Sequence, residues 1–139
     1  MSGRAIVTGL VLLALAVATA ACGHAHDADV GTCDGFVTVS LTVSAGPQPE
    51  FAWSPGCRMF ALTVTEGGAV VWSIRDSALE NSLEPTIVYG QLPLGAIEVA
   101  AAQELRPGTA YDVTLQWTNC SGGMPLCPAL HAGSMTFVQ

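Results

Sequence analysis

The sequence predicts an all-β protein, an antiparallel β-sandwich of seven or eight short strands. Three observations favour this fold class. Apolar and polar residues alternate with a period of two in several short segments from Phe36 onward, as in strands with one buried face. Turns rich in Gly and Pro separate these segments. No stretch after residue 22 has the 3.6-residue period of an amphipathic helix.

The first strand is expected at residues 37–43, where valine and leucine alternate with hydroxyl side chains. A short second strand contains Phe51 and Trp53. Residues 59–74 are expected to form a hairpin, because Gly67-Gly68 can adopt the positive φ of a tight turn. Six side chains of this hairpin are expected to share the buried face: Phe60, Leu62, Val64, Val70, Trp72 and Ile74.

The second half of the chain continues the pattern after a loop or short helical turn at residues 77–85. Four further segments are expected to be strands: residues 87–89, 97–101, 111–117 and a last strand that contains Met135 and Phe137. All the tryptophans fall on apolar strand faces. Trp53 is expected in the core, whereas Trp72 and Trp117 could be core residues or exposed anchors for a ligand.

Residues 1–21 have the pattern of an export signal, with Arg4 before an apolar stretch that ends in small residues. Thr19-Ala20-Ala21-Cys22 resembles a bacterial lipobox, although Thr19 replaces the usual leucine. The resemblance implies a lipid on Cys22 and a location in the bacterial cell envelope, on an inner or an outer membrane. Cleavage after Ala20 and an uncleaved anchor are the alternatives.

Residues 22–32 are small and polar and are expected to form a flexible tether. The tether contains two His and two Asp that could bind a divalent metal: His24, His26, Asp27 and Asp29. With a free amine on Cys22, His24 could complete a copper or nickel chelate. A solvated acidic spacer is the preferred interpretation.

Five cysteines are an odd number for an exported protein. If Cys22 carries a lipid, four remain and can pair completely. Three pairings are possible, and we expect Cys33–Cys57 and Cys120–Cys127, because the second pair closes a short loop. Disulfides are favoured over zinc ligation, because no C-x-x-C spacing occurs.

Residues 105–111, LRPGTAY, match the L-x-P-G-T-x-Y run of fibronectin type III domains, and residues 51–55, FAWSP, resemble an early strand of that family with its core Trp. The resemblance implies an immunoglobulin-like sandwich over residues 33–139. It also implies a tyrosine corner, in which Leu105 and Gly108 shape the turn and the Tyr111 hydroxyl bonds to nearby backbone. Disulfides are a departure from the family.

Four arginines, no lysine and eleven acidic residues argue against a nucleic-acid partner. No nucleophile elbow, zinc-protease motif, phosphate loop or cofactor motif is present. The sequence therefore predicts a non-catalytic interaction, adhesion or scaffolding module, with an envelope protein or glycan as ligand and the loop tip at residues 124–126 as one contact surface. The alternatives are metal binding by the tether and a small hydrolase in which His131, expected in a loop, meets a carboxylate in a cleft.

Overall fold

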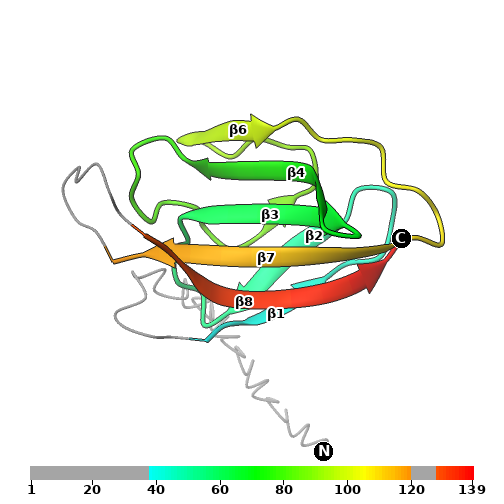
Figure 1. Ribbon diagram of the computed structural model, residues 1–139. Coiled ribbons are helices and arrows are strands. Elements are labelled where there is room, and N and C mark those ends of the chain that lie inside the picture. The colour runs from blue at the N-terminus through cyan, green and yellow to red at the C-terminus, as the bar shows by residue number, and fades with distance from the viewer. Residues whose placement is uncertain (1–37, 120–127) are drawn as a thin grey trace, which may run out of the picture.

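The computed structural model describes residues 38–119 and 128–139. These residues form two antiparallel sheets and no helix (Figure 1). The smaller sheet has the order β1-β2-β5, with β1 at Ser40–Val43, β2 at Glu50–Ser54 and β5 at Ile87–Val88. The larger has the order β6-β4-β3-β7-β8, with strands at Ala61–Glu66 (β3), Ala69–Asp76 (β4), Ala96–Ala100 (β6), Ala110–Thr118 (β7) and Ala129–Val138 (β8).

The all-β prediction is confirmed, and residues 77–85 form a loop without a helical turn. The described part of the chain holds no helix that could span a membrane. The first strand begins at Ser40, later than expected. Val39 instead lies beside the other sheet, where its N–H donates to the carbonyl of Ala132 at 3.0 Å.

Aromatic side chains from both sheets meet in a single core. Phe51 of β2 is fully buried and packs 5.7 Å from the Phe137 ring and 6.4 Å from the Trp72 ring. Trp72 is 0% exposed and Trp117 6%, so both belong to the core and the interpretation of them as exposed ligand anchors is wrong. Burial of such large side chains is the main force that holds the two sheets together.

The β3–β4 hairpin turns at Gly67-Gly68, as expected, and both glycines have positive φ. A β-bulge between Val64 and Thr65 then changes the alternation on β4. Val71 is 5% exposed and faces the core, whereas Val70 is 45% exposed. The expectation that Val70 shares the buried face of Trp72 is therefore wrong.

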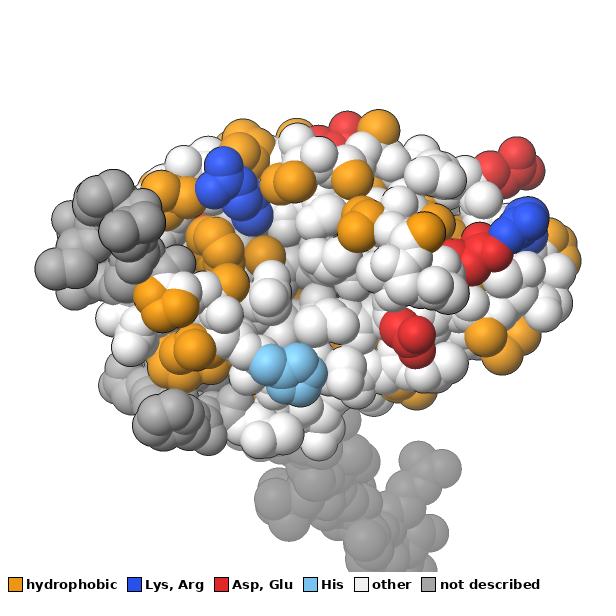
Figure 2. Space-filling model, viewed as in Figure 1, with side chains coloured by type: hydrophobic (Ala, Val, Ile, Leu, Met, Phe, Trp, Pro, Cys, Tyr) orange, Lys and Arg blue, Asp and Glu red, His pale blue; other side chains and the backbone are white. Residues whose placement is uncertain are grey.

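The larger sheet carries a polar outer face. Figure 2 shows that the centre of this face has few charged or apolar side chains. Thr63 and Ser73 lie opposite each other there and share a hydrogen bond of 3.0 Å between their hydroxyls. This is the alternation of a sheet with one face in the core and one in solvent.

Candidate functional site

Most of the residues predicted to carry lipid, metal or disulfides lie outside the described residues: Cys22, His24, His26, Asp27, Asp29, Cys33, Cys120 and Cys127. The loop tip at residues 124–126 lies there too. Cys57 is described and is 6% exposed. Its carbonyl accepts a hydrogen bond of 2.7 Å from the Trp53 indole N–H, which holds the segment after β2 against the core.

The residues assigned to the tyrosine corner meet at the start of β7. Tyr111 is 1% exposed, and its hydroxyl accepts a hydrogen bond of 2.8 Å from the backbone N–H of Arg106. Its ring stacks 5.6 Å from Phe137. Gly108 turns the chain with a φ of +75°, and Leu105 is buried beside it. This connection therefore anchors the segment that leads into β7.

His131 lies on β8 and not in the expected loop. Its side chain is exposed, and the residue pairs with Gln116 in the sheet. No hydrogen bond or ion pair joins it to a carboxylate within the described residues. The arrangement expected for a hydrolase, a histidine and a carboxylate in one cleft, is absent from this part of the chain. The same ranges hold no cluster of three metal-ligating side chains.

β6 and β8 are the two edge strands of the larger sheet within the described residues. β8 is partly covered, because β1 lies beside it and the Val39 N–H bonds across to Ala132. In the smaller sheet, β5 is only two residues long. β6 pairs with β4 on one side and with no described strand on the other (Figure 1). Its sequence, AIEVA, has no Lys or Pro, and it carries one charge at Glu98 and a bulge at Val99.

Apolar side chains gather along this edge. Ile97 and Val99 of β6 are 38% and 59% exposed, and Leu94 just before the strand is fully exposed. Figure 2 shows apolar side chains over β6 at the top of the molecule. The sequence predicted a strand at residues 97–101, and the structure has β6 at Ala96–Ala100. The apolar alternation was a sound signal for the strand, but it could not show that the strand lies at an edge.

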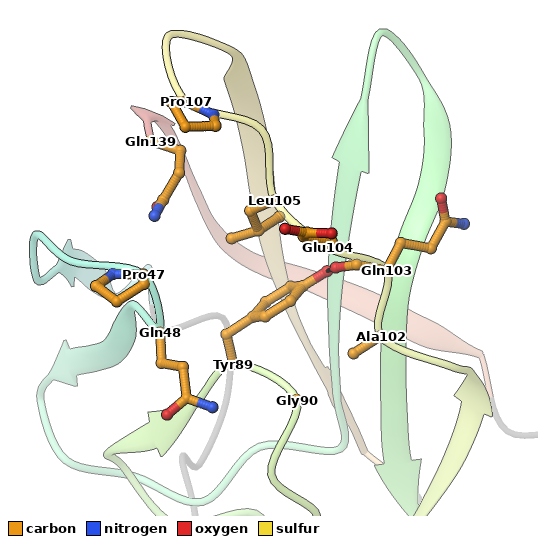
Figure 3. Close-up of a pocket in the computed structure, with 10 residues that line it drawn as sticks. All are labelled: Pro47, Gln48, Tyr89, Gly90, Ala102, Gln103, Glu104, Leu105, Pro107 and Gln139. Carbon is orange, nitrogen blue, oxygen red and sulfur yellow. Dashed lines mark hydrogen bonds between the residues drawn. The ribbon is translucent and has the colours of Figure 1, made fainter.

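A groove of about 420 Å³ lies where β6 leads into β7 (Figure 3). Three segments and the last residue, Gln139, form its walls: residues 47–48 after β1, residues 89–90 after β5, and residues 102–107. Figure 3 shows the Tyr89 ring and the Leu105 side chain on its inner wall and two prolines on its rims. Its volume falls in the range of sites that bind small ligands.

The Tyr89 side chain is fixed in place at the inner wall. Its hydroxyl donates to the carbonyl oxygen of Gln103 at 2.8 Å, with the Val71 carbonyl a second acceptor at 3.3 Å. The ring packs 5.0 Å from Trp72. Burial raises the pKa of Tyr89 above its ordinary value of 10.0, although the bond to Gln103 opposes the rise and the nearby Tyr111 adds to it. The phenol is therefore neutral at physiological pH, and its role in the groove is structural.

Glu104 has the one charged side chain among the residues that line the groove. It is exposed, and no ion pair joins it to a cation in the described chain. The neighbouring Arg106 pairs instead with Glu66 at the β3–β4 hairpin. One carboxylate with no His, Ser, Cys or second acid in the lining can hold a ligand by charge and hydrogen bonds. It does not form the acid–base pair or activated nucleophile of a hydrolase.

Neither the groove nor the open edge follows from the sequence. The groove is built from residues far apart in the sequence, such as Gln48, Tyr89 and Gln139, and no spacing rule brings these together.

Comparisons with protein-family models, with curated proteins and with solved structures found no match to this chain.

Proposed function

We propose that this protein is a non-catalytic interaction module of the bacterial cell envelope, anchored by a lipid on Cys22 and exported by the signal at residues 1–21. In this proposal residues 22–32 form the tether and two disulfides, Cys33–Cys57 and Cys120–Cys127, brace the domain. The domain holds an extended segment of another envelope protein along the open edge of β6.

The sheet arrangement supports an immunoglobulin-like or fibronectin type III-like sandwich. β1, β2 and β5 form one sheet, and β3, β7 and β8 lie together in the other. This agrees with the grouping of strands A, B and E against strands C, F and G in such domains. The buried Tyr111, whose hydroxyl bonds to backbone five residues upstream, supports the same proposal.

The open edge of β6 is the observation that carries the proposed function. An unpaired strand offers its backbone N–H and C=O groups to an added strand, and natural edges are usually protected by charged residues, Pro, bulges or a covering loop. β6 has one charge, Glu98, and a bulge at Val99, but it has no Lys or Pro and exposes Ile97 and Val99. A partner strand would gain backbone hydrogen bonds and cover apolar surface at once.

Charge favours a different protein as the occupant over a second copy. Glu98 is the one charged residue of β6, so antiparallel pairing of two copies about this position would place two carboxylates opposite each other. The full chain also has a formal charge of -7, and two such domains repel. The favoured partner is an extended, neutral or basic segment with alternating apolar residues.

A photo-crosslinking amino acid at position 99, introduced into the natively expressed protein, tests this proposal. The expected product is a covalent adduct with one envelope protein, mapped by mass spectrometry to an extended segment. A synthetic peptide of that segment should bind the mature protein. The double variant Ile97→Lys/Val99→Lys should weaken this binding at least about tenfold, because a charged edge resists strand addition.

Val138→Lys is the matched control, since Val138 is 68% exposed and lies on β8, away from the β6 edge. It should leave peptide affinity within about twofold of the unsubstituted protein. Equal affinity of the peptide for the double variant would contradict the proposal, as would the absence of an adduct at position 99. An adduct with a second copy of this chain would contradict the choice of partner.

A further inference from the structure

We infer that the groove beside Tyr89 binds a single cationic side chain, lysine or arginine, of a partner polypeptide. The groove and the open edge are separate sites, so either assignment can fail while the other holds.

The groove has the shape and chemistry for the stem of such a side chain. Its exposed apolar surface comes from Pro47, Ala102 and Pro107, and the buried Tyr89 ring and Leu105 close its floor (Figure 3). Lysine and arginine carry three or four methylene groups that pack on apolar surface while the charged head stays hydrated. A short polar ligand would leave this apolar surface in contact with water.

The charge at the groove favours a cation. Glu104 contributes a carboxylate with no cationic partner in the described residues, and the closest arginine in sequence, Arg106, is paired with Glu66. No basic side chain lines the groove. An anionic ligand would meet Glu104 without a compensating charge, whereas an ammonium or guanidinium group would form a charge-assisted hydrogen bond with it.

Hydrogen bonds hold both sides of the groove before any ligand arrives. On one rim the Gln139 side-chain N–H donates to the Gly46 carbonyl at 2.7 Å, and the Gly108 N–H donates to the Gln139 backbone carbonyl at 2.7 Å. On the other side of the groove the Tyr89 hydroxyl donates to the Gln103 carbonyl at 2.8 Å. A preformed site loses little conformational entropy on binding.

The test titrates short peptides into the mature, full-length protein in detergent micelles and follows backbone amide shifts by NMR. The probes are blocked tripeptides with a central lysine or arginine, and the neutral analogues with norleucine or citrulline in its place. The cationic peptides should shift Gly90, Leu105 and neighbouring amides. They should bind at least about fivefold more tightly than the neutral analogues, because a charged hydrogen bond is lost.

Glu104→Gln should remove most of this preference, and Glu80→Gln should not. Glu80 is also exposed and lies outside the groove lining, so both variants lose the same charge. Equal binding of cationic and neutral peptides would overturn the inference, as would equal effects of the two variants or the absence of shifts around the groove. Spermidine binding more tightly than the peptides would overturn the assignment to a partner polypeptide.

Discussion

Tyr89 links the core to the groove through one aromatic ring. Its ring packs against the Trp72 ring in the core. Its hydroxyl donates a hydrogen bond to the Gln103 carbonyl at the groove. Sequence alternation predicted Tyr89 on a brief strand with an apolar face. The bond to Gln103 was not predictable, because it depends on where the chain after β6 runs. Trp53 and Tyr111, by contrast, were assignable to the core from the sequence alone.

Stability should fall at alkaline pH through Tyr89. Burial raises the pKa of Tyr89 in the folded protein, so between pH 10 and that raised value the phenol ionises first in the unfolded chain. The free energy of unfolding should therefore be independent of this group below about pH 9 and decline above about pH 10. Urea titrations at pH 8 and pH 10.5 should show a larger decline for the unsubstituted protein than for Tyr89→Phe. Equal declines would show that Tyr89 is not the group responsible.

Gly133 is a second residue with a defined structural role, because it lets Val39 approach β8 closely. A Cβ there would lie 2.7 Å from the Val39 carbonyl oxygen and 2.9 Å from a Val39 methyl group, so backbone would have to move. Gly133→Ala should lower the free energy of unfolding by about 1–3 kcal/mol, measured by urea denaturation. Gly56→Ala is the matched control, with an added Cβ at an ordinary 3.5 Å from Pro85, and should change it by less than about 1 kcal/mol. Similar losses from both would refute the close approach of Val39 to β8.

At the scale of elements, the sequence predicted each strand that the described residues form, but not every face. The Gly67-Gly68 turn and the strand around Tyr111 follow from local chemistry, and the structure confirms them. Bulges are different, because one unpaired residue moves the following side chains to the other face. The bulge in β4 exposes Val70, and the edge position of β6 exposes Ile97. Both depend on strand pairing between distant segments.

Two alanine substitutions test whether β4 has the bulge or the simple alternation of buried and exposed residues. Val71→Ala removes buried methyl groups and should lower the free energy of unfolding by about 2 kcal/mol. Val70→Ala acts on a side chain that is 45% exposed and should lower it by less than about 1 kcal/mol. Urea denaturation of the two variants measures both effects. The reverse order of losses would restore the alternation expected from the sequence and remove the bulge.

At the scale of the whole molecule, the proposed protein has a tether, a domain and two binding surfaces. Loss of residues 1–21 removes Arg4 and no acidic residue, so the mature chain would carry a formal charge of -8. Such a charge disfavours non-specific contact with anionic lipid surfaces. In the proposed function, a covalent lipid supplies the attachment instead, and the open edge of β6 and the groove at Glu104 bind partners in the same compartment. This arrangement rests on how the five cysteines are used.

The intact mass of the natively expressed protein tests that use most directly. We predict the mass of residues 22–139, increased by acyl chains on Cys22 and reduced by two hydrogens for each of two disulfides. Alkylation without reduction should add nothing, because no thiol remains free. An unmodified Cys22, a retained leader or thiols that react with the alkylating agent would contradict the account.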